Sequence, residues 1–173
     1  MKKIKDILYI LLIIVLCLTA IYPFSLFKIE VIGVSMAPNL SEGDIGYCDK
    51  VFYKNNLKRF DIVVVDRPED DVIKRIIGLP NETIYYSDNI LYVDSKPVEE
   101  KFISDAAKQF TIYDIRQFEY SLKNPIELGE DEYFIMGDNR QLSYDSRSYG
   151  PIKIDSIEGK LVYIKHNKKW III

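Results

Sequence analysis

Residues 62–77 read IVVVDRPEDDVIKRII, and they predict the fold more clearly than any other stretch of the chain. Two runs rich in β-branched residues, 62–65 and 72–77, are separated by a polar segment that contains a proline. β-Branched residues favour strands, whereas polar residues and proline favour the connection between strands. We therefore predict two largely buried strands. Lys74 is their unusual member, because its amine stands among aliphatic side chains.

Shorter patterns along the chain also predict strands. Residues 28–32 alternate polar and apolar side chains, and residues 83–86 and 90–93 flank a Ser-Asp-Asn turn signal typical of a hairpin. Further strands are predicted at residues 133–136, 161–165 and 170–173, although the last of these would also suit the membrane interface. Residues 103–118 come nearest to a helical pattern but lack an apolar stripe. We predict a mostly β domain with a closed or folded-over sheet.

An uncharged apolar run occupies residues 7–27, close to the N-terminus. At about 1.5 Å per residue, a helix of this length would span a hydrocarbon core of about 30 Å. Lys2, Lys3 and Lys5 precede the run and favour a cytoplasmic N-terminus. A cleavable signal peptide is the alternative, but its apolar region would hold only about 7–15 residues. We therefore predict a transmembrane anchor in residues 1–28 and an extracytoplasmic domain in residues 29–173.

Charge excludes one class of partner. The 173 residues include 23 basic and 26 acidic side chains. Residues 1–28 hold four of the lysines and one aspartate, so the remainder has 19 basic and 25 acidic residues and a net charge near −6. A nucleic-acid-binding domain needs a basic surface, so we expect no nucleic-acid partner.

The scarcity of cysteine and histidine excludes several kinds of site. Cys17 lies in the apolar run and Cys48 lies outside it, so we expect neither a disulfide nor a cysteine-based metal site. His166 is the only histidine, and no acid or nucleophile motif surrounds it. We therefore expect a surface or strand-end histidine, no Ser-His-Asp triad, no metal and no cofactor.

Ser35 and Lys74 are the candidates for chemistry. A serine hydroxyl needs a base beside it, and burial can lower the pKa of a lysine from about 10.4 until its amine serves as that base. Side chains alternate along a strand, so Lys74 and Arg75 are expected to face opposite ways. Taken singly, each residue also has a simpler interpretation: Ser35 as a turn or cap residue, and Lys74 as a surface lysine.

Four stretches together resemble the type I signal peptidases, the membrane-anchored Ser/Lys proteases that remove signal peptides from exported proteins. Residues 35–40 read SMAPNL and resemble the nucleophile motif of that family, and residues 43–45 read GDI. Residues 74–80 read KRIIGLP and resemble the lysine motif, and residues 137–147 read GDNRQLSYDSR. The stretches follow the order of the family, and the single anchor and small size resemble its Gram-positive branch.

The resemblance implies a role for each matched residue. Ser35 would attack the scissile carbonyl, and its backbone N–H would form part of the oxyanion hole. Lys74 would take the serine proton and later activate the deacylating water, with the Ser143 hydroxyl orienting the amine. Asp138, Asp145, Arg147 and Arg75 would support the site structurally.

The resemblance also implies shallow pockets for small substrate residues at positions −1 and −3. The matching residues are Val31, Met36, Leu40, Val72 and Ile73. Three positions depart from the family pattern. Asn39 stands where a threonine is usual, residues 81–82 replace a common Gly-Asp, and Gly33 offers no side-chain donor to the oxyanion hole.

We expect a signal-peptidase-like β-sheet/barrel catalytic domain with one N-terminal transmembrane helix, and a variable insertion at about residues 99–128. The expected function is removal of N-terminal signal peptides from secretory preproteins at the bacterial cell membrane. The lipid bilayer and the secretion machinery are the expected partners. One alternative is a non-catalytic assembly factor for surface structures such as pili. Another is a relative of the self-cleaving repressors, against which the anchor and the missing DNA-binding helix pair argue.

Overall fold

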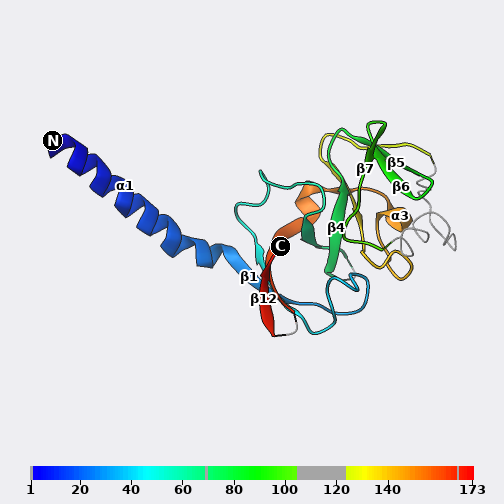
Figure 1. Ribbon diagram of the computed structural model, residues 1–173, viewed down its shortest axis with the longest axis horizontal. Helices are drawn as coiled ribbons and strands as arrows, with labels where there is room; N and C mark the ends of the chain where they lie inside the picture. The colour runs from blue at the N-terminus through cyan, green and yellow to red at the C-terminus, as the bar shows by residue number, and fades with distance from the viewer. Residues whose placement is uncertain (1, 69, 105–123, 167) are drawn as a thin grey trace.

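The computed structural model describes residues 2–68, 70–104, 124–166 and 168–173, and most of its elements are strands (Figure 1). An eight-stranded sheet has the order β1-β2-β11-β3-β4-β9-β10, with β12 paired to β11. It contains β1 (Leu26–Glu30), β2 (Ile45–Asp49), β3 (Ile62–Val65), β4 (Val72–Gly78), β9 (Glu132–Met136), β10 (Ile152–Lys153), β11 (Ile157–His166) and β12 (Lys169–Ile172). A four-stranded sheet, ordered β7-β6-β5-β8, contains β5 (Thr83–Ser87), β6 (Ile90–Val93), β7 (Lys96–Val98) and β8 (Ile126–Glu127).

The larger sheet is curled by its longest strand. β11 pairs antiparallel with β3, β2 and β12, and its register shifts between Ile157 and Gly159 and again between Leu161 and Tyr163. Such irregularities bend a strand and increase its twist. Within the described residues the order of strands is open, so the curled sheet resembles part of a barrel that strand pairing does not close. The prediction of a mostly β fold is therefore confirmed.

The individual strand predictions agree well with the structure. The two β-branched runs form β3 and β4, which pair antiparallel from Val65↔Val72 to Ile62↔Arg75. The predicted hairpin is β5–β6, and Asp88 and Asn89 turn it with positive φ values of 49° and 63°. The last predicted strand is β12. The short helix α3 (Ser146–Tyr149), capped by the side chain of Asp145, was not predicted. Most of residues 103–118 lies outside the described residues.

The N-terminal run forms the helix α1 (Lys2–Ile21), which projects away from the sheets in Figure 1. The helix ends before the uncharged run does. The last residues of the uncharged run lie beyond the helix. They form a 3₁₀ turn, η1 (Tyr22–Ser25), and the start of β1, which pairs with β2 from Leu26 onward. Among the helices of the described residues, none has the combination of length and hydropathy that a membrane span requires.

The two sheets approach each other closely at Gly78, where a larger residue would require the neighbouring side chains to move. A Cβ atom on Gly78 of β4 would lie 2.5 Å from a methyl group of Leu128 and 3.1 Å from one of Ile84. These residues belong to a core in which Ile77, Ile84, Leu91 and Phe134 are fully buried. The close approach fixes the second sheet against the end of β4, the strand that also carries Lys74.

The prediction of a strand-end position for His166 is confirmed, and the two cysteines lie in different elements. Cys17 and Cys48 are free, with Cys48 fully buried in the core. His166 is the last residue of β11, and its Nδ1 lies 2.7 Å from Oδ2 of Asp44. The histidine is therefore a half-buried strand-end residue.

Truncation of Phe134 tests the core between the two sheets. Because its side chain is fully buried, we expect Phe134→Ala to lower the free energy of unfolding by about 3–5 kcal/mol. Urea unfolding of the full chain, followed by the fluorescence of Trp170, measures the change. Ile90→Ala on β6 is the matched control, since Ile90 is 45% exposed, and its effect should be about 0.5 kcal/mol or less. Equal losses in both variants would contradict this account of the core.

Candidate active site

Ser35 lies in the loop between β1 and β2. Two hydrogen bonds from Asn139 hold the main chain of this loop. The backbone N–H of Asn139 donates to the Ser35 carbonyl at 3.0 Å, and the Asn139 side-chain amide donates to the Val34 carbonyl at 3.2 Å. Within the loop, the Leu40 N–H donates to the Met36 carbonyl at 3.0 Å. Residues 137–147 therefore position the nucleophile loop as well as lying near it in space.

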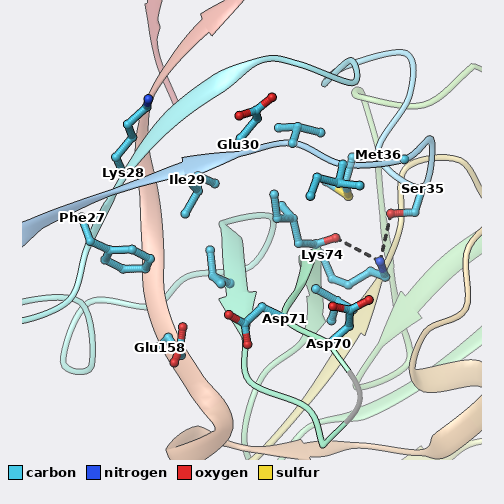
Figure 2. Close-up of a pocket in the computed structure, with 16 residues that line it drawn as sticks. Phe27, Lys28, Ile29, Glu30, Ser35, Met36, Asp70, Asp71, Lys74 and Glu158 are labelled. Carbon is cyan, nitrogen blue, oxygen red and sulfur yellow. Dashed lines mark hydrogen bonds between the residues drawn. The ribbon is translucent and has the colours of Figure 1, made fainter.

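Lys74 lies on β4, paired opposite Val63, and points at Ser35 (Figure 2). Its Nζ donates to Oγ of Ser35 at 2.9 Å and to the carbonyl of Ile73 at 3.1 Å. Only 3% of the Lys74 residue is exposed. The two candidates from the sequence are thus in direct contact. Ser35 does lie in a turn, as its simpler interpretation holds, whereas Lys74 is buried and is not a surface lysine.

The setting of Lys74 favours its neutral amine. Burial lowers its pKa to about 8, because a low-dielectric environment disfavours the ammonium form. The positive charge of Arg67 acts in the same direction, while Asp145 and Asp138 act against it. At mildly alkaline pH the amine beside Ser35 therefore carries a free lone pair, which a base requires.

Arg75 faces away from Lys74, as alternation along the strand predicts, and binds Asp138 through two hydrogen bonds. The Arg75 Nε–Asp138 Oδ1 distance is 2.7 Å and the Nη2–Oδ2 distance is 2.6 Å. Asp138 is fully buried and also accepts a bond of 2.9 Å from the side-chain amide of Asn39. The unusual Asn39 therefore links the nucleophile loop to the ion pair, a role that the sequence alone did not reveal.

A second buried ion pair supports the other side of residues 137–147. The guanidinium of Arg147 donates from Nε to Asp145 Oδ1 at 2.8 Å and from Nη2 to Oδ2 at 2.9 Å. The Gly137 N–H donates to the same carboxylate at 3.0 Å. Burial alone would raise the pKa of Asp145, but Arg147 and these hydrogen bonds hold it below its ordinary value.

Ser143 and Ser35 approach each other across Gly137. A Cβ atom on Gly137 would lie 2.3 Å from Ser143 Oγ and 2.4 Å from the Ser35 carbonyl oxygen, so only glycine fits. The Ser143 hydroxyl is buried and lacks a partner of good hydrogen-bond geometry, although it is close enough to lower the pKa of Asp145. Within the described residues, the bonds of Lys74 go to Ser35 and Ile73 and not to Ser143.

A groove with a volume of about 570 Å³ runs from the Ser35–Lys74 pair along β1 and the start of β4 (Figure 2). Of the predicted pocket residues, Val31, Met36, Val72 and Ile73 line this groove. Leu40 does not line it. Its side chain is 1% exposed and packs behind the groove in the core that contains Val31 and Met36.

Two residues contribute to the site although the sequence analysis gave them no role in it. Asn139 lies in a stretch that was singled out, but its two bonds to the nucleophile loop depend on a chain reversal that the sequence pattern does not specify. Arg67 lies in the β3–β4 connection, with its guanidinium carbon 4.1 Å from the ring centroid of Tyr149 and 5.1 Å from that of Tyr144. These rings are far from Arg67 in sequence, so no local signal indicates the contact.

Comparison with known proteins is consistent with this geometry. A family described as "Signal peptidase, peptidase S26" matches residues 4–165. The chain is 40% identical over 138 residues to signal peptidase I V of Bacillus subtilis, an alignment that covers 77% of this chain and 80% of the relative. It is 30% identical over 183 aligned positions to signal peptidase I of Streptococcus pneumoniae, covering 88% of this chain and 87% of that one.

The fold of this chain also resembles that of a solved signal peptidase I. The crystal structure of a signal peptidase I from Enterococcus faecalis superposes with a TM-score of 0.50 at 33% identity, covering 61% of this chain and 97% of that one. The region matched by the family includes all four motifs of the sequence. The chain therefore belongs to the signal peptidase family, peptidase S26, which is a family of serine proteases.

Proposed function

We propose that this chain removes N-terminal signal peptides from exported preproteins, with Ser35 as nucleophile and Lys74 as general base. The observation that carries the proposal is the 2.9 Å contact between Lys74 Nζ and Ser35 Oγ, made by a lysine that is 3% exposed. Burial lowers the pKa of this lysine to about 8. A hydroxyl nucleophile beside a base whose pKa is close to ambient pH is the arrangement that acyl transfer requires.

The proposed reaction has two halves. In the first, Ser35 Oγ forms a bond to the scissile carbonyl carbon while Lys74 takes the hydroxyl proton and then gives it to the leaving amine. This step breaks the peptide bond and leaves the signal peptide as an ester of Ser35. In the second half, Lys74 takes a proton from a water molecule, which attacks the ester carbonyl carbon. The bond from that carbon to Ser35 Oγ breaks, Lys74 returns its proton to Oγ, and the released carboxylic acid loses its proton to solvent.

The backbone N–H of Ser35 is the proposed oxyanion donor. Among the described residues, no protein group accepts a hydrogen bond from it, so it is available to a substrate carbonyl. Preorganised donors of this kind typically matter by 10²–10³ in rate. Ser143 is the proposed positioning residue for the amine, and its buried, poorly paired hydroxyl beside Gly137 supports that role. Asp138, Asp145, Arg75 and Arg147 support the site through their buried ion pairs.

Position in the cell is part of the same proposal. Residues 1–28 would anchor the chain, single-pass and with its N-terminus in the cytoplasm, and residues 29–173 would act outside the membrane. The basis is the uncharged run of residues 7–27 behind Lys2, Lys3 and Lys5. Preproteins with small residues at −1 and −3, delivered by the secretion machinery, would reach the site at the bilayer surface. The non-catalytic alternative has no need for a buried Ser35–Lys74 contact, and nothing in the site favours it.

Removal of either member of the pair tests the mechanism. We expect Ser35→Ala and Lys74→Ala each to abolish cleavage of a preprotein, with a loss of more than about 10³-fold in kcat, because neither group has a substitute in the site. The readout is mass spectrometry of the products from a mixed set of preproteins, with circular dichroism as the check on folding. Ser87→Ala and Lys96→Ala change exposed residues of the smaller sheet and should retain full activity. Normal cleavage by Ser35→Ala or Lys74→Ala would refute the proposed pair.

The pH dependence of cleavage tests the lysine. Lys74 must be neutral to accept a proton, and its pKa is lowered to about 8. Activity should therefore fall as pH decreases through about 8, approaching a tenfold loss for each further unit of acidification. The measurement is the pH profile of kcat/KM on one preprotein, with protein stability checked at each pH. A profile that stays flat between about pH 5 and 9 would contradict a lysine base.

Gly137 tests the packing behind the pair. We expect Gly137→Ala to lower kcat by at least about tenfold, because the added Cβ would overlap Ser143 Oγ and the Ser35 carbonyl. The comparison is Gly129→Ala, whose Cβ would meet only the flexible side chain of Glu132 at 3.3 Å. Both variants are assayed for cleavage and for urea unfolding. An active Gly137→Ala enzyme would show that the tight approach of Ser143 and Ser35 is unnecessary.

A further inference from the structure

The groove is open along two strand edges. Among the described residues, β1 is an outer strand of its sheet and pairs with β2 alone. On β4, the pairing with β9 begins at Arg75, so residues 72–74 have no strand partner on that side within the described part of the chain. Exposed strand edges bind extended peptides through main-chain hydrogen bonds, and neighbouring side chains supply the selectivity. An extended substrate can therefore lie between β1 and the start of β4.

The two walls of the groove differ in charge. On the β1 wall, Lys28 and Glu30 offset one another. The opposite wall carries three exposed carboxylates, Asp70, Asp71 and Glu158, and we call these three residues the acidic wall (Figure 2). Among the described residues that line that wall, Lys74 is the one basic residue, and its amine is buried at Ser35. No cation among the described residues forms a salt bridge with the acidic wall.

These carboxylates also act on one another. Partial burial raises the pKa of Glu158, and the negative charges of Asp71 and Asp66 raise it further. Carboxylates that share a region without a cation repel each other, and a bound cation relieves the repulsion. The groove is thus electrostatically complementary to a basic side chain.

Strand spacing places the acidic wall relative to the reacting bond. Asp70 and Asp71 directly precede β4, which begins at Val72. If the chain is extended there, at about 3.3 Å per residue, Asp71 lies roughly 10 Å and Asp70 roughly 13 Å along it from Lys74. The residues matched to the −1 and −3 pockets line the same groove. A substrate with its −1 residue at Ser35 would therefore bring positions −4 and −5 alongside Asp71 and Asp70. The long side chains of lysine and arginine extend this window to −6.

We propose that the acidic wall makes this enzyme prefer signal peptides that carry lysine or arginine at positions −4 to −6. The inference rests on the proposed function, and it adds a charge preference to the requirement for small residues near the cleavage site. Because the carboxylates are exposed, the preference should be moderate and sensitive to salt.

Matched peptides test the preference. Three sets of fluorogenic peptides share one Ala-x-Ala cleavage site and carry Lys, Gln or Glu at position −4, −5 or −6. They are cleaved by the full chain in detergent at low salt and at about 0.5 M salt. We expect kcat/KM to fall in the order Lys, Gln, Glu in at least one set, with about a fivefold range at low salt and less than twofold at high salt. Asp70→Asn/Asp71→Asn should remove the range.

The control variant Glu127→Gln/Glu130→Gln removes two exposed carboxylates outside the groove and should keep the full range. Equal cleavage of the Lys, Gln and Glu peptides by the wild-type enzyme would overturn this inference alone. The inference also fails if the preference persists in Asp70→Asn/Asp71→Asn or disappears in the control variant. Absence of cleavage of every peptide would instead overturn the proposed function, and this inference with it.

Discussion

The burial of one amine in a strand is the constraint on which the rest of the site depends. An ammonium ion enclosed by aliphatic side chains is strongly disfavoured, so Lys74 must either lose its proton or be paired with a charge. Here its neighbours are the Ser35 hydroxyl and a main-chain carbonyl, and its pKa falls to about 8. Among the described residues, no carboxylate accepts a hydrogen bond from Lys74, and its amine therefore loses its proton more readily than that of an exposed lysine, as the proposed role of base requires.

Two nearby carboxylates oppose the effect of burial on the pKa of Lys74. Asp138 and Asp145 both raise the pKa of Lys74, yet burial outweighs them. Each carboxylate is bound through two hydrogen bonds by its own arginine, Arg75 or Arg147, and so acts on the lysine as part of a nearly neutral pair. The two ion pairs hold residues 137–147 in place, and each arginine offsets part of the charge with which its carboxylate stabilises the ammonium form.

Local patterns in the sequence predicted much of this arrangement, and long-range packing explains the remainder. β-Branched runs predicted β3 and β4, and alternation predicted that Lys74 and Arg75 face apart. Leu40 was expected in the groove but packs behind it, because an apolar residue in a loop carries no period that reveals which side it faces. Asn39 was noted only as a departure from the family pattern. Its bond to Asp138 joins positions almost a hundred residues apart, which no local signal indicates.

The acidic wall and Lys74 line the same groove, but the carboxylates face water whereas the amine of Lys74 is buried. Charges that face water are screened over about 10 Å at 0.1 M salt, so Asp70 and Asp71 can attract a basic peptide while their effect on a buried amine is weakened. Arg67, held against the rings of Tyr144 and Tyr149, adds a positive charge that lowers the pKa of Lys74. A peptide bound with a basic residue against the acidic wall would add a further positive charge near the lysine. At the same distance and with the same screening, this charge would act mainly on the binding of the peptide and only weakly on the protonation of Lys74.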